Sequence, residues 1–216
     1  MNFIRLSFLT LLFYGCSANN LLITRSLNAL KTNEVDIQFY RDLSYASILF
    51  SLEDNPYVLV LGDGSQDRSR WYSADSSNIL TKNYKVIGIR GFTNDFTIHY
   101  PPSLKEIFLE LMSNNNSLSS NFSAFISFSN PKTTLLEISF LYTLDKTSVV
   151  REVLASGRNR NLFMMREDYE IPSIGYKGTN YYWISANGVV HESKQDIISL
   201  KKKARIQAIK YSGFDN

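Results

Sequence analysis

The chain has 216 residues, of which 44% are hydrophobic and 20% are charged, and its formal net charge is +3 at pH 7. These proportions are typical of a folded globular protein and exclude a disordered or collagen-like chain. A single cysteine excludes a disulfide framework and any zinc site built on paired cysteines. The small charge argues against nucleic acid as a partner, because phosphate binding needs a concentrated basic surface.

The N-terminal segment has the features of a targeting sequence. A basic start precedes an apolar run over residues 6–14 that is too short to span a bilayer, and Gly15-Cys16 follows it. A cysteine directly after a small residue resembles the bacterial lipoprotein box, in which the thiol is acylated and the chain is cleaved before it. We therefore predict a lipoprotein signal peptide over residues 1–15 and lipidation of Cys16, with an ordinary secretory peptide as the alternative. By the sorting pattern of such proteins, Ser17 rather than Asp after the cysteine implies delivery to the outer membrane.

Residues 16–42 are predicted to form a lipidated tether with a short helix, and residues 43–216 an antiparallel β domain. From Tyr45 the apolar residues recur with a period of two, as in a half-buried strand. Similar short runs continue to the end of the chain. The further candidate strands are 57–61, 69–73, 85–90, 96–100, 122–128, 135–142, 147–154, 161–166, 181–185, 189–194 and 205–211.

Turn residues separate these runs, as expected for antiparallel connections. They are Gly62-Asp63-Gly64, Asn94-Asp95, Asn130-Pro131 and Asn187-Gly188, of which the last is typical of a tight hairpin. The predicted fold class is mainly β, an antiparallel β-barrel or half-barrel with one or two short helices; a sandwich also fits the spacing.

One helix interrupts the strands. Ser103 and Glu106 form a capping box after two prolines, and the apolar residues that follow have helical spacing. These residues are Leu104, Ile107, Phe108 and Leu111. We expect the helix to close the core at an open face or mouth of the curved sheet, or to act as a lid over a ligand cavity. The Asn- and Ser-rich stretch 113–121 is predicted to be a loop.

The sequence offers no strong catalytic pattern. His99 and His191 are isolated strand residues, no G-x-S-x-G pattern surrounds a serine, and no histidine spacing indicates a metal. The acidic clusters all fall at predicted turns, where carboxylates usually serve solubility. These clusters are Glu53-Asp54, Asp63 with Asp67, and Glu167-Asp168 with Glu170. We therefore predict a protein that is not an enzyme, with no cofactor and no metal.

Two surface features could contact a glycan or a partner. The basic run 201–203 with Arg205 could bind anionic groups, or it could protect the edge of a sheet from aggregation. Aromatic rings stack on sugars, which makes Trp71, Tyr72, Tyr182 and Trp183 candidate contacts. Because side chains alternate along a strand, only one residue of each neighbouring pair can face outward.

An ordered series of motifs resembles the group 4 capsule polysaccharide lipoprotein family (GfcB/YjbF type). The motifs are Asp36-Ile37-Gln38, Tyr45-Ala46-Ser47, Val58-Leu59-Val60-Leu61-Gly62, Arg70-Trp71-Tyr72-Ser73-Ala74-Asp75, Ile79-Leu80-Thr81 with Lys85-Val86, and Asn180-Tyr181-Tyr182-Trp183-Ile184-Ser185 with Gly188 and Glu192-Ser193-Lys194-Gln195. Tyr84 departs from the family by standing at a usual turn glycine. The resemblance implies an antiparallel barrel or half-barrel, a periplasm-facing outer-membrane lipoprotein, and a role near capsule or exopolysaccharide export.

The sequence supports three hypotheses. The first is a non-enzymatic accessory lipoprotein of capsule or exopolysaccharide assembly or export. It would be anchored in the outer membrane by its lipid and would contact polysaccharide-export proteins or glycan. The second is a carrier that binds an apolar or lipid-linked ligand in a half-barrel cavity. The third is a glycan-processing enzyme, which would need two carboxylates converging in one cleft.

Overall fold

The computed structural model describes residues 35–65, 68–92, 94–114, 119–130, 132–133 and 135–211. The predicted signal peptide, Cys16 and most of the predicted tether lie outside these residues. The chain divides into two units, residues 1–36 and residues 37–216, and all of the strands belong to the second unit.

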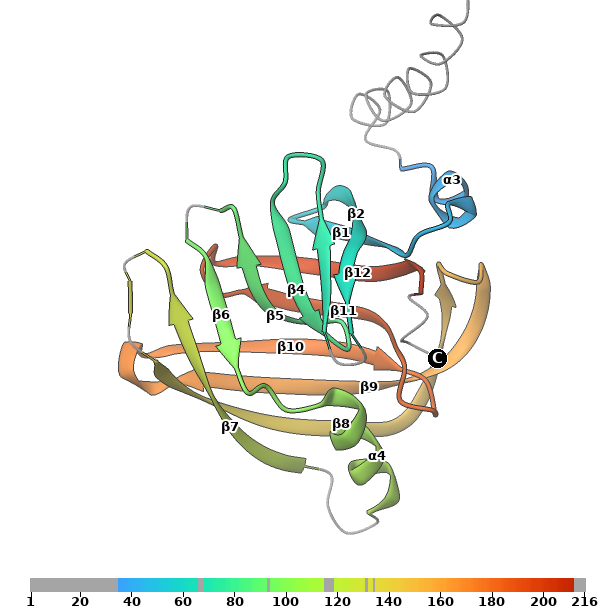
Figure 1. The fold of residues 1–216 in the computed structure, drawn as a ribbon. Coiled ribbons are helices and arrows are strands. Elements are labelled where there is room, and N and C mark those ends of the chain that lie inside the picture. The colour runs from blue at the N-terminus through green and yellow to red at the C-terminus, as the bar shows by residue number, and fades with distance from the viewer. Residues whose placement is uncertain are drawn as a thin grey trace, which may run out of the picture. The chain divides into compact units, whose positions relative to one another are not determined.

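Twelve antiparallel strands form a closed barrel in which consecutive strands are neighbours (Figure 1). The mainly β prediction is confirmed, and the barrel rather than the half-barrel or sandwich is the form observed. The strands are β1 (Ser47–Leu52), β2 (Asn55–Gly64), β3 (Ser69–Tyr72), β4 (Asn78–Lys82), β5 (Lys85–Arg90), β6 (Phe96–His99), β7 (Ser119–Phe128), β8 (Leu136–Val153), β9 (Arg158–Ile171), β10 (Tyr176–Ile184), β11 (Val190–Ile197) and β12 (Lys202–Lys210).

The barrel closes where β12 pairs with β1. Ile48 lies opposite Ala208 and Leu52 lies opposite Ala204, and the other side of β12 pairs with β11. The expectation that the basic run 201–203 protects a sheet edge is therefore wrong, since a strand paired on both sides has no edge. One of its lysines, Lys202, instead forms an ion pair of 2.6 Å with Glu53 at the end of β1.

Two α-helices lie among the described residues, α3 (Ile37–Asp42) and α4 (Leu104–Ser113), together with the 3-10 turn η1 (Pro172–Ile174). The predicted cap of α4 is present, because the Ser103 hydroxyl accepts a hydrogen bond from the Glu106 amide. All four predicted apolar residues of α4 are at most 2% exposed and belong to the main core. The helix packs against β7 and β8, so it closes the core rather than acting as a lid. In the described part of the chain, no helix has both the length and the apolar character needed to cross a membrane.

The strand predictions differ from the structure mainly in length. The two predicted strands at 135–142 and 147–154 are one strand, β8, with an irregularity between Asp145 and Ser148. The residues between Asp145 and Ser148 form a local irregularity within the strand, where the Asp145 carboxylate accepts a hydrogen bond of 2.8 Å from the Thr147 amide. The predicted turn Gly62-Asp63-Gly64 is part of β2, which has a bulge at this point. The predicted loop 113–121 is also shorter than expected, since β7 begins at Ser119.

Strand β4 is absent from the predicted strands because its sequence is half polar. A two-residue turn, Asn83-Tyr84, joins it to β5, and both residues have positive φ angles of 48° and 61°. This conformation explains why a glycine is usual at the position of Tyr84. Here the ring of Tyr84 is 4% exposed and packs near Trp71, with ring centroids 6.0 Å apart, which offsets the backbone strain.

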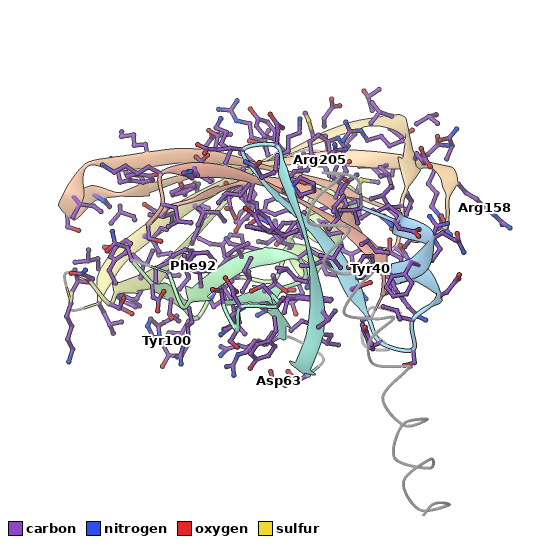
Figure 2. The ribbon with its side chains drawn as sticks, turned by 90° about the horizontal axis from the view of Figure 1, so that it is seen from above. Tyr40, Asp63, Phe92, Tyr100, Arg158 and Arg205 are labelled. Carbon is purple, nitrogen blue, oxygen red and sulfur yellow. The ribbon has the colours of Figure 1, made fainter. Side chains whose placement is uncertain are left out.

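The β8–β9 hairpin continues past the barrel wall and bends at its end (Figure 1). Arg158, at the start of β9, projects from the tip of this hairpin (Figure 2). The Arg41 guanidinium of α3 donates a hydrogen bond to the Leu154 carbonyl in the same hairpin. A small second core lies under the hairpin, formed by Val153, Leu162 and Trp183.

Candidate functional site

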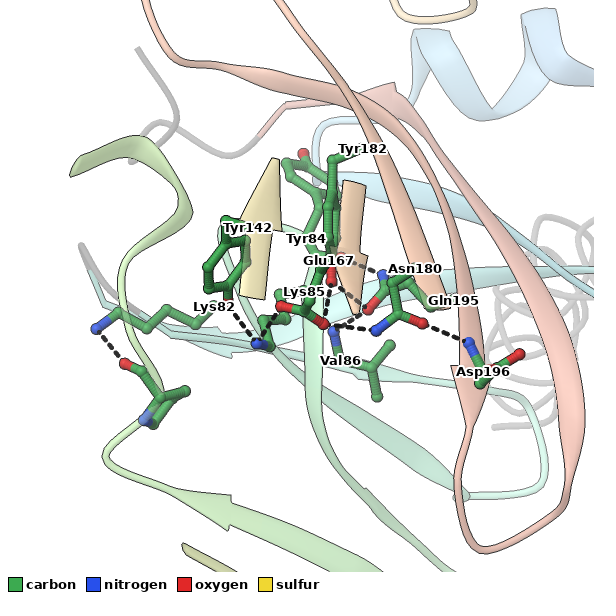
Figure 3. Close-up of polar contacts among 11 residues, drawn as sticks. Lys82, Tyr84, Lys85, Val86, Tyr142, Glu167, Asn180, Tyr182, Gln195 and Asp196 are labelled. Carbon is green, nitrogen blue, oxygen red and sulfur yellow. Dashed lines mark hydrogen bonds and ion pairs between the residues drawn. The ribbon is translucent and has the colours of Figure 1, made fainter. Parts of the chain in front are cut away.

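A buried ion pair lies inside the barrel between Lys85 at the start of β5 and Glu167 in the middle of β9 (Figure 3). The two residues are 1% and 0% exposed, and Lys85 Nζ lies 2.5 Å from Glu167 Oε2. The prediction that Glu167 lies at a turn is therefore wrong. Its partner is 82 positions away in the sequence, so local pattern gives no sign of the pairing.

Further polar side chains complete the hydrogen bonding of this pair. Lys85 Nζ donates to the Tyr142 hydroxyl at 2.8 Å and lies 3.6 Å from the centroid of the Phe140 ring. The Glu167 carboxylate accepts hydrogen bonds from Asn180 Nδ2 at 2.6 Å and from the Tyr182 hydroxyl at 3.2 Å. A buried charge is tolerated only when it is paired and hydrogen-bonded, and both charges here meet this condition.

Burial also controls the protonation of the network. It lowers the pKa of Lys85 from its ordinary value, and the charge of Glu167 partly opposes this shift. Burial, followed by the charge of Glu167, raises the pKa values of Tyr142 and Tyr182 well above the ordinary value. Both phenols therefore stay protonated and hold their hydrogen bonds across the physiological pH range.

Large side chains fill the barrel around this network. Among the described residues, the fully buried ones include Trp71, Tyr142, Tyr182, Lys85 and Phe108. A carrier of apolar ligands would need a large open apolar cavity here, and this packing does not favour that hypothesis. Larger concave surfaces lie on the outside of the barrel.

One such surface is a groove on the outer face of β7, β8, β9 and β10, with a volume of about 630 Å³. The register of these strands aligns two rows of outward side chains across it. We call this surface the β7–β10 groove. The first row is Asn121, Leu141, Asp168 and Thr179, and the second row is Ser123, Ser139, Glu170 and Lys177.

Hydrogen bonds order the charged part of the groove. Asp168 Oδ1 accepts from the Thr179 hydroxyl at 2.7 Å and from the Arg166 guanidinium at 2.8 Å. Glu170 forms an ion pair of 3.1 Å with Lys177 on the neighbouring strand. The β7 side of the groove offers only the amide of Asn121 and the hydroxyl of Ser123, both exposed. The groove therefore presents neutral hydrogen-bonding groups beside charged side chains that form ion pairs with one another.

Comparison with known proteins identifies the family. The family model described as "Group 4 capsule polysaccharide lipoprotein gfcB, YjbF" matches residues 24–208, which include every strand from β1 to β11 and most of β12. The chain belongs to the group 4 capsule polysaccharide lipoprotein (GfcB/YjbF) family. The resemblance predicted from the sequence motifs is thereby confirmed.

Two solved lipoproteins are similar to this member of the GfcB/YjbF family. The crystal structure of the hypothetical lipoprotein YmcC from Escherichia coli (K12) aligns with a TM-score of 0.63 and 19% sequence identity, over 85% of this chain and 93% of that chain. This likeness shows the shared fold. A putative lipoprotein from Parabacteroides distasonis ATCC 8503 aligns with a TM-score of 0.33 and 9% identity, over 80% and 97% of the two chains. No curated protein matches the chain by sequence.

In this GfcB/YjbF protein, the four aromatic candidates for glycan contact differ in burial and in the face of the barrel on which they lie. Trp71 and Tyr182 are 1% and 0% exposed and point into the barrel, so the expectation of surface contact is wrong for them. Trp71 instead donates a hydrogen bond of 2.9 Å to the Thr81 hydroxyl. Trp183 lies on the outer face at 8% exposure, covered by Arg151, whose Cζ is 4.1 Å from the ring centroid.

Tyr72 is the half-buried member of the set. Its ring lies directly over Gly62 on β2, where an added Cβ would come within 2.4 Å of the ring carbons. The glycine therefore permits the close approach of the tyrosine on the outer face. A contact role for Tyr72 and Trp183 stays a prediction.

The other sequence candidates lie apart from one another. His99 contacts the Ser127 hydroxyl at 3.0 Å on the barrel wall, and His191 lies near the end of β12. Of the acidic clusters, Asp168 and Glu170 share the β7–β10 groove, whereas Glu167 beside them points inward. Asp67 lies outside the described residues. Sequence reasoning missed the groove because it arises from the register of four strands.

Proposed function

We propose that this protein is a non-enzymatic accessory lipoprotein of capsule or exopolysaccharide assembly or export, anchored in the outer membrane and facing the periplasm. The observation that carries the proposal is the family match over residues 24–208. The large side chains buried inside the barrel also favour a role for its outer surface.

The β7–β10 groove is the surface proposed to contact glycan or an export protein. Its amide, hydroxyl and carboxylate groups match the hydrogen-bonding needs of a carbohydrate, and Leu141, which is 38% exposed, offers an apolar contact to a sugar face. The pairing of Asp168 and Glu170 with neighbouring cations suits a binding surface. We therefore assign these two carboxylates to binding and not to glycoside cleavage.

The test of the groove is complementation of a gene deletion. A strain lacking the gene is supplied with the wild type or with a variant in which Asn121→Trp and Ser123→Trp fill the groove, and surface polysaccharide is measured. Both residues are exposed, so the variant should fold and reach the envelope in normal amounts. We expect the groove variant to resemble the deletion strain.

The matched control is Val150→Trp, which places the same ring on an exposed residue of β8 outside the groove. This control should restore the wild-type level of polysaccharide. Equal restoration by the groove variant would reject the groove as the contact surface. If the purified wild type cleaved polysaccharide and a Glu170→Gln variant did not, an enzymatic function would replace the non-enzymatic proposal.

The anchor is tested by fractionation of the cell envelope. A Cys16→Ala variant should appear in the soluble periplasm, because the thiol that carries the lipid is absent. A Ser17→Asp variant should keep its lipid and stay in the inner membrane, by the same sorting pattern. Membrane attachment of the Cys16→Ala variant would contradict lipidation at this residue.

A further inference from the structure

A second cavity lies away from the β7–β10 groove, where the β8–β9 hairpin meets the β10–β11 hairpin and the residue that comes after β12. Its volume is about 170 Å³. The polar side chains that line it are Ser156, Arg160, Ser185, Asn187, His191 and Tyr211, and none of the described lining residues carries a carboxylate.

His191 is the most unusual residue of this cavity. Its side chain is 7% exposed, and its Nδ1 atom contacts the Tyr211 hydroxyl. Burial, followed by the charge of Arg160, lowers the pKa of His191 to about 4, so the ring is neutral near pH 7. When the tyrosine donates to Nδ1, the proton of the neutral ring resides on Nε2.

The Nε2 atom of His191 has no hydrogen-bond partner among the described residues, although it is buried. A buried polar atom without a partner is unfavourable, and in native proteins such an atom commonly marks a bound water, ion or other group. In the tautomer with the proton on Nε2, the missing partner is an acceptor.

Arg160 supplies a positive charge to the same cavity. It forms no ion pair within the described part of the chain, in contrast to Arg151, which lies opposite it on β8 and pairs with Glu192. Asn187 adds a third donor. Its Oδ1 atom accepts a hydrogen bond of 2.6 Å from the Ser185 hydroxyl, and its NH₂ group can therefore donate to a ligand.

We propose that Arg160, His191 and Asn187 form a binding site for a small oxyanion, a carboxylate or a phosphate. A guanidinium, an imidazole N–H and an amide NH₂ together satisfy the oxygen atoms of such a group, and the described lining residues carry no carboxylate that would repel it. The cavity is large enough for one such group, either free or carried on a single sugar. The site is separate from the β7–β10 groove and does not depend on the function proposed for that groove.

The test uses the purified full-length protein in detergent, at low ionic strength. Nitrogen-15 NMR of the histidine side chains is followed while sodium phosphate, sodium glucuronate or glucose is added. We expect a saturable shift of the His191 Nε2 resonance with at least one of the two anions and none with glucose. Tighter binding of glucuronate would assign a sugar carboxylate as the source of the oxyanion, and tighter binding of phosphate would assign a phosphate.

The variants separate a specific site from general charge. Arg160→Gln should weaken anion binding at least tenfold, and Arg160→Lys, which keeps the positive charge, should bind more tightly than Arg160→Gln. Both variants should fold, because Arg160 is exposed on the surface of a hairpin. Arg158→Gln removes an equal charge from the same strand at the outward-pointing tip and should leave binding unchanged (Figure 2). The absence of a saturable shift with either anion, or equal binding by the Arg160→Gln and Arg158→Gln variants, would overturn the proposal.

Discussion

At the scale of single residues, the buried ion pair of Lys85 and Glu167 depends on the hydrogen bonds of the side chains around it. Each charge is removed from water, and each is compensated by the other and by the hydrogen bonds of Tyr142, Asn180 and Tyr182. Such a pair is weak evidence for net stabilisation, because desolvation opposes the attraction. Loss of one partner alone is a different matter, since it leaves a buried charge uncompensated.

We therefore expect Lys85→Met to lower the free energy of unfolding by about 3–5 kcal/mol in urea denaturation. Adding Glu167→Gln should recover much of this loss, because the neutral amide keeps an acceptor for Asn180 and needs no cation. The exposed ion pair of Lys177 and Glu170 provides the control, because Lys177→Met should change the free energy of unfolding by less than about 1 kcal/mol. Equal effects of the two lysine substitutions would show that the buried pair is not energetically distinct.

His191 predicts a dependence of stability on pH. Burial, and then Arg160, lower its pKa to about 4 in the folded state, below the ordinary value of 6.5, and the Tyr211 hydroxyl also faces the ring. As the pH falls, the unfolded chain therefore binds this proton first. The contribution of His191 to stability is complete above about pH 6.5 and is lost progressively toward about pH 4.

Between pH 7 and pH 5, the wild type should lose about 2 kcal/mol more stability than a His191→Gln variant, which has no proton to bind at this position. Urea denaturation of both proteins across this range, without added phosphate or carboxylate buffer, measures the difference. Parallel pH profiles for the two proteins would contradict burial of a neutral His191.

At the scale of elements, α4 is the part of the chain whose local and tertiary signals agree most closely. Its cap, its apolar spacing and its buried face all coincide with the sequence pattern. By contrast, the turn between β4 and β5 depends on tertiary packing, because Tyr84 adopts a positive φ that its own side chain disfavours.

The helix cap can be tested separately from the helix packing. Ser103→Ala removes the hydroxyl that accepts the Glu106 amide, and it should lower stability by about 1 kcal/mol. Ser103→Asp should retain most of the stability, because a carboxylate also accepts this hydrogen bond and suits a helix N-terminus. Thermal or urea unfolding measures both changes, and a loss with Asp equal to that with Ala would contradict a capping role.

At the scale of the whole molecule, closure of the barrel removes the exposed sheet edge that the basic run 201–203 predicts. Strands β1 and β12 are separated by most of the chain, and their pairing links the start of the fold to its end. Backbone hydrogen bonds in this pair should open only with the whole barrel.

Amide hydrogen exchange tests this closure. The amides of Leu49 and Gln207, which lie opposite each other in the closing pair and belong to the same hydrogen-bonded row as the Glu53 amide that donates to the Lys203 carbonyl, should exchange as slowly as those in the β9–β10 pair. The Leu61 amide, which donates to the Ala46 carbonyl beside a bulge, provides a comparison near the end of a strand. Fast exchange confined to β1 and β12 would indicate an open half-barrel.

The sequence by itself determined the mainly β class, the helix after Ser103 and the family, because alternation, capping and turn residues act over a few neighbouring positions. Tertiary structure decided the rest. Strand pairing across the chain placed Glu167 in the core instead of a turn, turned Trp71 and Tyr182 inward, and aligned eight side chains into the β7–β10 groove. These features depend on register and closure, which join residues far apart in the chain and therefore leave no local pattern to read. Position in the sequence made Cys16 the predicted anchor, and only the folded barrel defines the surface that such an anchor would hold in place.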